Sequence, residues 1–307
     1  MKKEIITNND PKSPISEVFR SLRTNMQYMN TNKKLLMVVT STMQGEGKSF
    51  IAANLAVTFA QAGKNTIIID ADMRRPRQHK IFEIDMYPGM SNYLSGVSLS
   101  KTSREITLND CIYKTKVTNL SIMPAGNIPP NPSELLLSGN LKKLIDQLEE
   151  NFDVIIFDGA PCLLVTDATI IARKVNYTIL VASQNKTKIE DLKEAQRKIK
   201  HVGGHLAGVV LNRVKISKKE YGNKYYYGLK SSYGDNGHFS DRNDDDIYDF
   251  KIDVKEEKNV KNETHKEGKK TTNKTTKVEK EVKETEQPSD KIQDILEQIN
   301  KLKESSK

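Results

Sequence analysis

The stretch "TSTMQGEGKSFIAANLA" (residues 40–56) decides the fold, because it has the residues of a phosphate-binding loop between a strand and a helix. The apolar run "LLMVVT" (35–40) leads into it, and a helical pattern follows it. In such a loop the backbone N–H groups surround a phosphate, Lys48 reaches its outer oxygens and the hydroxyl of Ser49 binds Mg²⁺. The strict pattern G-x4-G-K-[ST] has glycine where this chain has Thr42. The stretch predicts a nucleotide-phosphate site, and a glycine-rich connector that ends in Lys-Ser is the alternative.

Further candidate nucleotide contacts lie at the end of a later strand. The run "LAGVVLN" (206–212) ends with Asn212, and Arg213 follows it, near the place where such folds hold adenine. The expected cofactors are ATP and Mg²⁺. The predicted nucleotide-binding residues are Gly45, Glu46, Gly47, Lys48, Ser49, Phe50, Asn212 and Arg213.

Acidic residues follow two further apolar runs. Asp70 and Asp72 follow "TIII" (66–69), and Asp158 ends "DVIIFD" (153–158). Carboxylates at the carboxyl edge of a parallel sheet face the same crevice as the phosphate loop, where they can hold Mg²⁺. Capping of a helix after the strand is the alternative for Asp70 or Asp72. The predicted metal ligands are Ser49, Asp72 and Asp158, and the predicted catalytic residues are Lys48, Asp70, Asp72 and Asp158.

Short apolar runs alternate with helical patterns along the chain. Several runs are apolar at every position, as strands buried on both faces of a parallel sheet require. This alternation predicts an α/β fold like that of P-loop NTPases, a doubly wound and mostly parallel sheet flanked by helices. The predicted strands are 35–40, 66–70, 120–124, 153–158, 177–183 and 206–212, and the predicted helices are 16–30, 48–62, 133–150, 167–173 and 187–201.

The composition changes sharply near the C-terminus. Residues 251–307 contain no Phe, Tyr or Trp and about half of them are charged, so they cannot bury enough apolar surface to fold alone. Near the end an apolar stripe predicts a short helix that folds only against a partner or its own copies, and transient helicity without function is the alternative. The predicted organisation is an oligomerisation helix region (1–34), a P-loop domain (35–217), a tyrosine cluster (218–240) and a charged, mostly disordered extension (241–307) with a short helix at 289–303.

Charge and cysteine content exclude several classes of protein. The 307 residues carry 49 Lys and Arg against 40 Asp and Glu, a formal charge of +9 that is spread along the chain. Without a single basic stripe, the charge does not indicate a nucleic-acid partner. Cys111 and Cys162 are too few for a disulfide framework or a metal cluster. With no leader segment or membrane span expected, the sequence predicts a cytoplasmic protein.

Two further features of the sequence need an explanation. Five tyrosines lie in a glycine- and lysine-rich segment without apolar neighbours, namely Tyr221, Tyr225, Tyr226, Tyr227 and Tyr233. At helical spacing, Glu17, Arg20 and Arg23 share one side of a helix, where they can meet charges on another subunit. The alternatives are a disordered segment that tolerates tyrosine and an exposed, salt-bridged helix face.

Taken together, these motifs resemble those of the bacterial tyrosine kinases of capsule and exopolysaccharide assembly, often called BY-kinases. The resemblance covers nearly all of residues 15–234. Such kinases have a phosphate loop, a second acidic motif D-x-D-x-R (here Asp70, Asp72 and Arg74) and a third motif that ends in Asp158. A C-terminal tyrosine cluster and an E-x2-R-x2-R motif, here starting at Glu17, complete the pattern.

The resemblance implies a non-specific protein-tyrosine kinase that phosphorylates itself in trans. It makes the five clustered tyrosines the phosphate acceptors, and Glu17, Arg20 and Arg23 an interface in a homo-oligomeric ring. It also implies a membrane-bound polysaccharide co-polymerase on a separate chain as activator, recruitment to the inner face of the cell membrane and a cognate tyrosine phosphatase. The family gives no role for residues 241–307.

Other proteins with this fold are the competing interpretations. A partition- or septum-positioning-type ATPase has an extra lysine five residues before the invariant one, where this chain has Met43, and it has no tyrosine cluster. An iron–sulfur carrier would need paired cysteines. A scaffold that binds nucleotide without turnover is a third alternative, and the complete acidic set argues against it.

Overall fold

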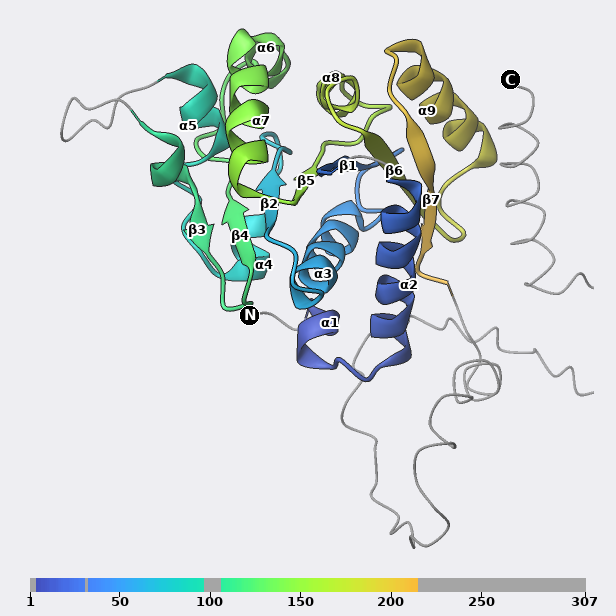
Figure 1. Ribbon diagram of the computed structural model, residues 1–307. Coiled ribbons are helices and arrows are strands. Elements are labelled where there is room, and N and C mark those ends of the chain that lie inside the picture. Colours follow the sequence, from blue (N-terminus) through green and yellow to red (C-terminus); the bar gives the residue numbers. More distant parts are fainter. Residues whose placement is uncertain (1–3, 31–32, 97–105, 215–307) are drawn as a thin grey trace, which may run out of the picture. The chain divides into compact units, whose positions relative to one another are not determined.

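The computed structural model describes residues 4–30, 33–96 and 106–214 (Figure 1). The predicted tyrosine cluster, the extension 241–307 and its helix at 289–303 lie outside the described residues. Within the described residues, none of the helices has the length and hydropathy needed to cross a membrane.

The described residues form a seven-stranded sheet in the order β3-β4-β2-β5-β1-β6-β7. All neighbouring strands run parallel except β3, which pairs antiparallel with β4. This arrangement confirms the predicted mostly parallel, doubly wound α/β fold. The strands are β1 Leu35–Ser41, β2 Thr66–Asp70, β3 Tyr113–Lys114, β4 Leu120–Met123, β5 Val154–Asp158, β6 Tyr177–Ser183 and β7 Leu206–Asn212.

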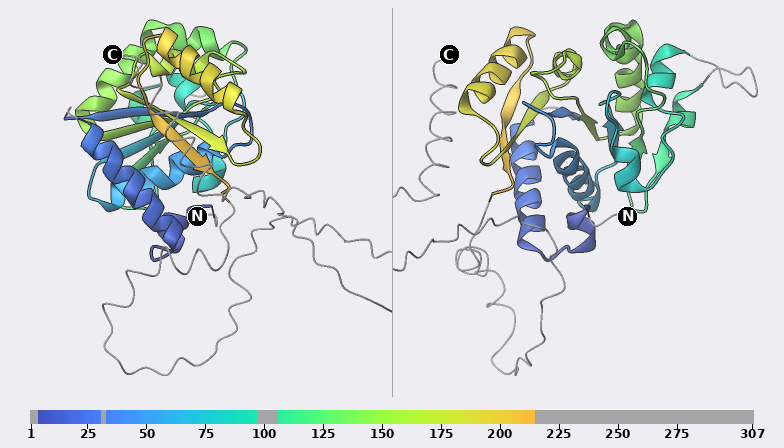
Figure 2. Two further views of the ribbon diagram at one scale, coloured as in Figure 1. Left: turned by 90° about the vertical axis from the view of Figure 1, so that its right-hand side faces the viewer. Right: turned by 180° about the vertical axis from the view of Figure 1, so that it is seen from behind.

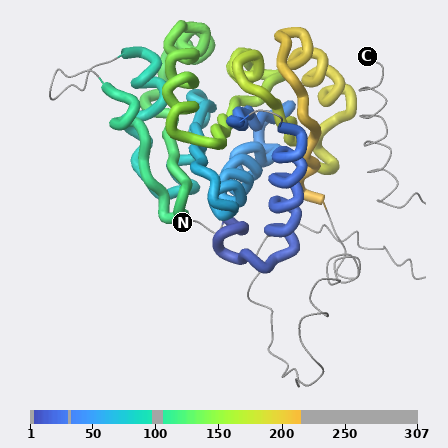
Figure 3. Tube along the Cα trace, viewed as in Figure 1, coloured from blue at the N-terminus to red at the C-terminus, as the bar shows by residue number. Residues whose placement is uncertain are grey.

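Helices cover both faces of the sheet (Figure 2). One face carries α1, α2, α3 and α4, and the other carries α5, α7, α8 and α9. Figure 3 follows the chain from the blue N-terminal helices to strand β7 at one edge of the sheet. The α-helices are α1 Ile6–Asn9, α2 Pro14–Met29, α3 Lys48–Gln61, α4 Gln78–Phe82, α5 Met90–Ser95, α6 Pro132–Leu137, α7 Gly139–Asn151, α8 Asp167–Ala172 and α9 Ile189–His201, and a 3₁₀ helix spans Leu108–Cys111.

The central strands are apolar at almost every position because both of their faces are buried. In β2, Ile68 packs in the cluster under α3, whereas Ile67 and Ile69 pack in the cluster on the opposite face. Successive side chains of a strand point to opposite faces, so a strand between two helical layers needs no polar positions. The same continuous burial made these strands recognisable in the sequence.

The predicted helix at 133–150 is wrong, because two helices occupy this region. Helix α6 ends at Leu137 and α7 begins at Gly139, with Ser138 between them in an extended conformation (φ −62°, ψ 154°). The Ser138 hydroxyl donates a hydrogen bond to the carbonyl of Leu135 (2.7 Å). Serine and glycine are common interruptions of helical patterns, and this pair divides the apolar stripe into two segments.

Helix α2 packs against α3 and shares its hydrophobic core. Ser13 caps α2 by accepting a hydrogen bond from the backbone N–H of Ser16 (3.2 Å), and Pro14 occupies the first helical turn, where its missing N–H costs nothing. Phe19 and Met26 are buried in the cluster beneath α3. The N-terminal segment is therefore packed onto the same core as the phosphate loop.

Candidate nucleotide and metal site

The phosphate loop connects the end of β1 to the start of α3. Gly45 and Gly47 both have positive φ, +80° and +99°, a region that residues with a side chain rarely adopt. A Cβ on Gly47 would also lie 2.0 Å from Nδ2 of Asn212. Helix α3 is long and buried, so its first N–H groups form a fixed site for an anion. The loop thus has the backbone shape that its glycines predicted.

The predicted acidic residues meet beside this loop. Lys48 pairs with Asp72 (Nζ to Oδ2, 2.8 Å) and with Asp158 (Nζ to Oδ1, 3.4 Å). Asp70 and Asp158 are direct neighbours at the ends of β2 and β5. The Lys48 ammonium also lies 3.3 Å from the hydroxyl of Ser49. The structure therefore brings together the residues that the sequence assigned to one crevice.

Charge in this cluster is unbalanced. Lys48 contributes one positive charge and the buried Asp70, Asp72 and Asp158 three negative charges, which leaves −2 when all are ionised. Burial disfavours the charge on Lys48, but Asp158 and Asp72 outweigh this effect, so the pKa of Lys48 is raised. A divalent cation would neutralise the excess.

The donor set fits Mg²⁺ that is shared with a nucleotide. Mg²⁺ usually takes one or two protein carboxylates and completes its shell with water and phosphate oxygens. Within the described residues, no group of three or more His, Cys, Asp or Glu side chains is placed to hold a metal ion. Ser49, Asp72 and Asp158 supply oxygens of the required type, and their role as metal ligands remains a prediction.

Both acids of the second motif also hold the turn that follows β2. Asp70 accepts hydrogen bonds at Oδ2 from the backbone N–H groups of Arg77 (2.9 Å) and Gln78 (2.8 Å) at the start of α4. Asp72 accepts one at Oδ1 from Arg75 (3.0 Å). The capping alternative is therefore observed for Asp70, whereas Asp72 fixes the turn and also contacts Lys48. Burial, and then repulsion from Asp158, raises the pKa of Asp70 to about 8.

Gln78 is a site residue that the sequence did not reveal. Its fully buried side-chain amide donates hydrogen bonds to Oδ2 of Asp158 (2.8 Å) and to the carbonyl of Ser49 (3.0 Å). It thereby connects the start of α3 to the end of β5. Its place in the sequence, eight residues after Asp70, could have suggested that it lies near the site. The sequence does not show, however, in which direction its amide points.

Arg74, the last residue of the second motif, pairs with Asp167 outside the cluster of Lys48, Asp72 and Asp158. Its Nε and NH2 donate to the two carboxylate oxygens of the buried Asp167 (2.8 and 3.2 Å). Ser133 donates to the same carboxylate (2.6 Å). Such a two-pronged pair has a fixed geometry. Arg74 therefore ties the turn after β2 to α8 and α6.

The remaining predicted nucleotide contacts divide into two groups. Asn212 lies at the loop, where its Nδ2 donates to the carbonyl of Glu46 (2.9 Å), and Arg213 is the next residue, exposed and with positive φ. In contrast, the side chain of Phe50 packs edge-to-face on Phe19 of α2 (5.8 Å between ring centres), and the side chain of Glu46 is buried. Only the main chain of Phe50 and Glu46 remains for a nucleotide.

The residues of the predicted oligomer interface have partners within the chain. Glu17 pairs with Arg20 (2.7 Å), and Arg20 also donates to the carbonyl of Pro11. Arg23 donates to the carbonyl of Thr58 in α3 (3.0 Å). Glu17 and Arg20 lie at the surface, so their predicted contact with a neighbouring subunit remains a prediction.

Comparisons with known proteins identify the family to which this chain belongs. The chain matches the AAA domain family over residues 34–208. It is 37% identical over 235 residues to tyrosine-protein kinase YwqD of Bacillus subtilis, covering 76% of this chain and 94% of YwqD. This chain belongs to the bacterial tyrosine-kinase family.

Solved structures agree with this assignment. The crystal structure of the chimerical protein CapA2B2 superposes with a TM-score of 0.65 at 38% identity and covers 70% of this chain and 92% of that one. The kinase domain of the Escherichia coli tyrosine kinase ETK also gives 0.65, at 27% identity, over 71% of this chain and 83% of that domain.

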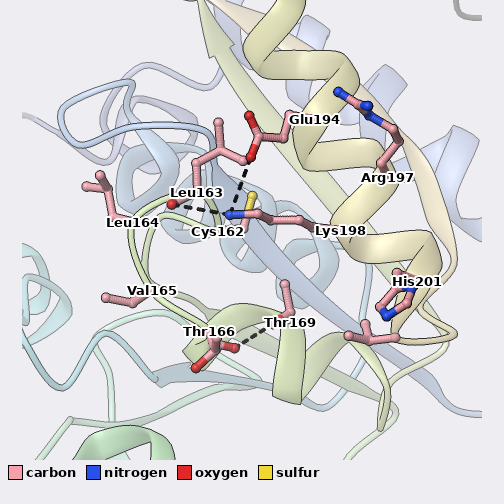
Figure 4. Close-up of a pocket in the computed structure, with 11 residues that line it drawn as sticks. Cys162, Leu163, Leu164, Val165, Thr166, Thr169, Glu194, Arg197, Lys198 and His201 are labelled. Atoms are coloured by element: carbon pink, nitrogen blue, oxygen red, sulfur yellow. Dashed lines mark hydrogen bonds and ion pairs between the residues drawn. The ribbon is translucent and has the colours of Figure 1, made fainter.

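A separate cavity of about 540 Å³ lies between α9 and the segment that follows Asp158 (Figure 4). Lys198 of α9 reaches across it to the carbonyl of Leu163 (3.4 Å) and pairs with Glu194 (3.6 Å). Leu163 in turn donates its N–H to the carbonyl of Thr42 in the phosphate loop (3.4 Å). The cavity is thus adjacent to the site but is not part of it.

Proposed function

We propose that this chain is a protein-tyrosine kinase that transfers the γ-phosphoryl group of ATP to tyrosine hydroxyls. The observation that carries the proposal is the meeting of Lys48, Asp72 and Asp158 at an anion-binding loop. Transfer through a loose transition state requires positioning and neutralisation of charge on the phosphoryl oxygens, with little covalent participation by the protein. A lysine, a magnesium-binding carboxylate set and backbone N–H groups supply these requirements.

Lys48 would exchange partners when the nucleotide binds. Its ammonium is held between two carboxylates, and the phosphate oxygens would take over one of these contacts. Mg²⁺, when held by Ser49, Asp72 and Asp158, supplies the charge that balances the carboxylates and the phosphates. Lys48 then stabilises the phosphoryl group as it leaves ADP.

Asp70 is our candidate for the group that accepts the phenol proton. A tyrosine hydroxyl has a pKa near 10 and arrives protonated, so an ionised carboxylate beside it aids transfer. The raised pKa of Asp70 makes it a stronger base once it is ionised. Both oxygens of Asp72 are engaged, by Lys48 and by the N–H of Arg75. Oδ1 of Asp70 has no hydrogen-bond partner within the described residues. Because Asp70 is fully buried, this role requires the turn after β2 to open when a tyrosine binds.

The acceptors in this proposal are Tyr221, Tyr225, Tyr226, Tyr227 and Tyr233 of another copy. A phosphate adds about −1.5 to −2 charges to each tyrosine, so a phosphorylated cluster would be repelled by the acidic site. We therefore propose that phosphorylation releases the cluster and dissociates a ring in which Glu17, Arg20 and Arg23 contact the neighbour. Light scattering before and after phosphorylation tests this step, because equal masses would contradict it.

The proposed biological role is regulation of capsular or exopolysaccharide polymerisation and export. The kinase would act in the cytoplasm, at the inner face of the membrane, through an activating co-polymerase on a separate chain. A tyrosine phosphatase would return it to the unphosphorylated state. The motif resemblance supports these assignments, and the names of the relatives support the kinase reaction.

Mass spectrometry of purified protein incubated with Mg·ATP tests the reaction. We expect phosphotyrosine on the cluster of the native chain and none on the Lys48→Met variant. A variant with Tyr225, Tyr226 and Tyr227 replaced by Phe should lose most of the label. Release of free phosphate with unmodified tyrosines would instead identify an ATPase.

A further inference from the structure

The phosphate loop contains a buried negative charge. Glu46 is 1% exposed, and its carboxylate accepts hydrogen bonds from the hydroxyl of Thr42 (2.8 and 3.0 Å), the N–H of Met43 (2.9 Å) and the hydroxyl of Thr187. A carboxylate that faced the crevice would repel phosphate. Because three donors hold this one inside the protein, it can fix the loop without opposing the ligand.

The segment between β6 and α9 holds the same loop from outside. Lys186 donates a hydrogen bond from Nζ to the carbonyl of Gln44 (2.8 Å), and a Cβ on Gly45 would lie 3.1 Å from that Nζ. Thr187 is itself fixed, because its hydroxyl accepts from the N–H of Ser183 (2.8 Å). The backbone N–H groups of Lys186 and Thr187 both donate to the carbonyl of Ser183 (3.1 and 3.0 Å). The segment is therefore a closed turn with two side chains directed at the loop.

We propose that Lys186 and Thr187 clamp the phosphate loop in its phosphate-accepting shape. Lys186 engages the carbonyl of Gln44, and Thr187 engages the carboxylate of Glu46. Because these two acceptors are held, the N–H groups of the loop already point in the required direction. Nucleotide binding then costs little conformational entropy in the loop. The proposal rests on the proposed use of this loop for a nucleotide. In it, both residues are positioning residues and neither touches the transferred phosphoryl group.

This role makes a specific kinetic prediction. A clamp on the loop supports the β-phosphate, which ATP and ADP share, so its loss should weaken both nucleotides equally. Loss of the hydrogen bond from the exposed Lys186 ammonium should raise Kd about tenfold, which corresponds to about 1.4 kcal/mol. At saturating ATP, kcat should not change.

The experiment measures Kd for Mg·ATP and Mg·ADP by titration calorimetry on the full chain. Lys186→Met and Thr187→Val should each raise both constants about tenfold. Lys186→Arg and Thr187→Ser should restore affinity, because they keep the donors. Lys188→Met is the matched control, since the exposed Lys188 makes no side-chain contact with the loop in the described structure. It should bind as the native chain does.

Several outcomes would overturn the clamp. The first is an unchanged nucleotide affinity in Lys186→Met. Because this site is exposed, the variant is expected to fold. Weaker binding of ATP but not of ADP, together with a lower kcat, would make Lys186 a contact of the transferred group instead. The binding assay does not depend on tyrosine transfer, so a chain that binds ATP without forming phosphotyrosine would refute the proposed function and leave the clamp standing.

Discussion

Replacing Gly47 with alanine tests whether the shape of the phosphate loop is set as described. Gly47 has φ of +99°, and Gly63, at the end of α3, has φ of +80°. The left-handed region costs a residue with a side chain about 1–2 kcal/mol. A new Cβ at Gly63 would meet no atom within 4 Å, so Gly63→Ala should lose only this amount of unfolding free energy.

Gly47→Ala should cost more because of Asn212. Its new Cβ would lie 2.0 Å from Nδ2 of Asn212, which must move and lose its 2.9 Å hydrogen bond to the carbonyl of Glu46. That bond is worth about 1 kcal/mol, so the total becomes about 2–3 kcal/mol. In an Asn212→Ala background the clash is gone, and the cost of Gly47→Ala should fall to that of Gly63→Ala.

Urea denaturation followed by circular dichroism measures these differences, and nucleotide titration measures their effect on the site. Gly47→Ala should weaken ATP binding, whereas Gly63→Ala should leave it unchanged. If Gly47→Ala and Gly63→Ala were equally stable and bound ATP equally well, the contact between Asn212 and the loop would not exist in solution.

Three further predictions concern residues around the site. Arg74→Ala leaves the buried Asp167 with fewer donors and should lower the unfolding free energy by about 1–3 kcal/mol, whereas Arg75→Ala should change it by less than about 0.5 kcal/mol in the same denaturation assay. Gln78→Leu removes a donor to Asp158, a proposed metal ligand, and should raise the Mg²⁺ concentration needed for half-maximal turnover; an unchanged Mg²⁺ titration would refute this role. Burial raises the pKa of Cys162 to about 11, so at pH 8 a thiol reagent should label it slowly in the folded chain and rapidly in urea, and equal rates would show that the site is open.

Much of the fold was predictable because the central strands are buried on both faces. The observed bounds of β2 and β6 equal those expected from the sequence, since a continuous apolar run ends where the sheet ends. The bounds of the edge strand β7 also match, although most of its residues are only partly buried. The short antiparallel β3 and the five-residue α4 gave no such signal. Two or five residues are too few to show a period, and their structure depends on neighbours distant in sequence.

The site was predictable where the chemistry lies in one motif or at a strand end. Lys48, Asp72 and Asp158 were placed together because parallel strands bring their carboxyl ends to one edge. The role of Gln78 and the buried position of the Glu46 carboxylate were not predictable, because both depend on the direction in which a side chain points. From the sequence alone, a glutamate in a phosphate loop is expected to be exposed. The structure shows its carboxylate buried, with the hydroxyls of Thr42 and Thr187 as hydrogen-bond donors.

A mixing experiment tests transfer between copies most directly. The Lys48→Met chain, which keeps its tyrosines, is combined with an active chain in which the five clustered tyrosines are replaced by Phe, and both receive Mg·ATP. The account predicts phosphotyrosine at Tyr225, Tyr226 and Tyr227 of the Lys48→Met chain. The account would be contradicted if the tyrosines of the Lys48→Met chain stayed unmodified while the native chain, incubated by itself, was labelled at a rate independent of its concentration. That result would mean transfer within one copy.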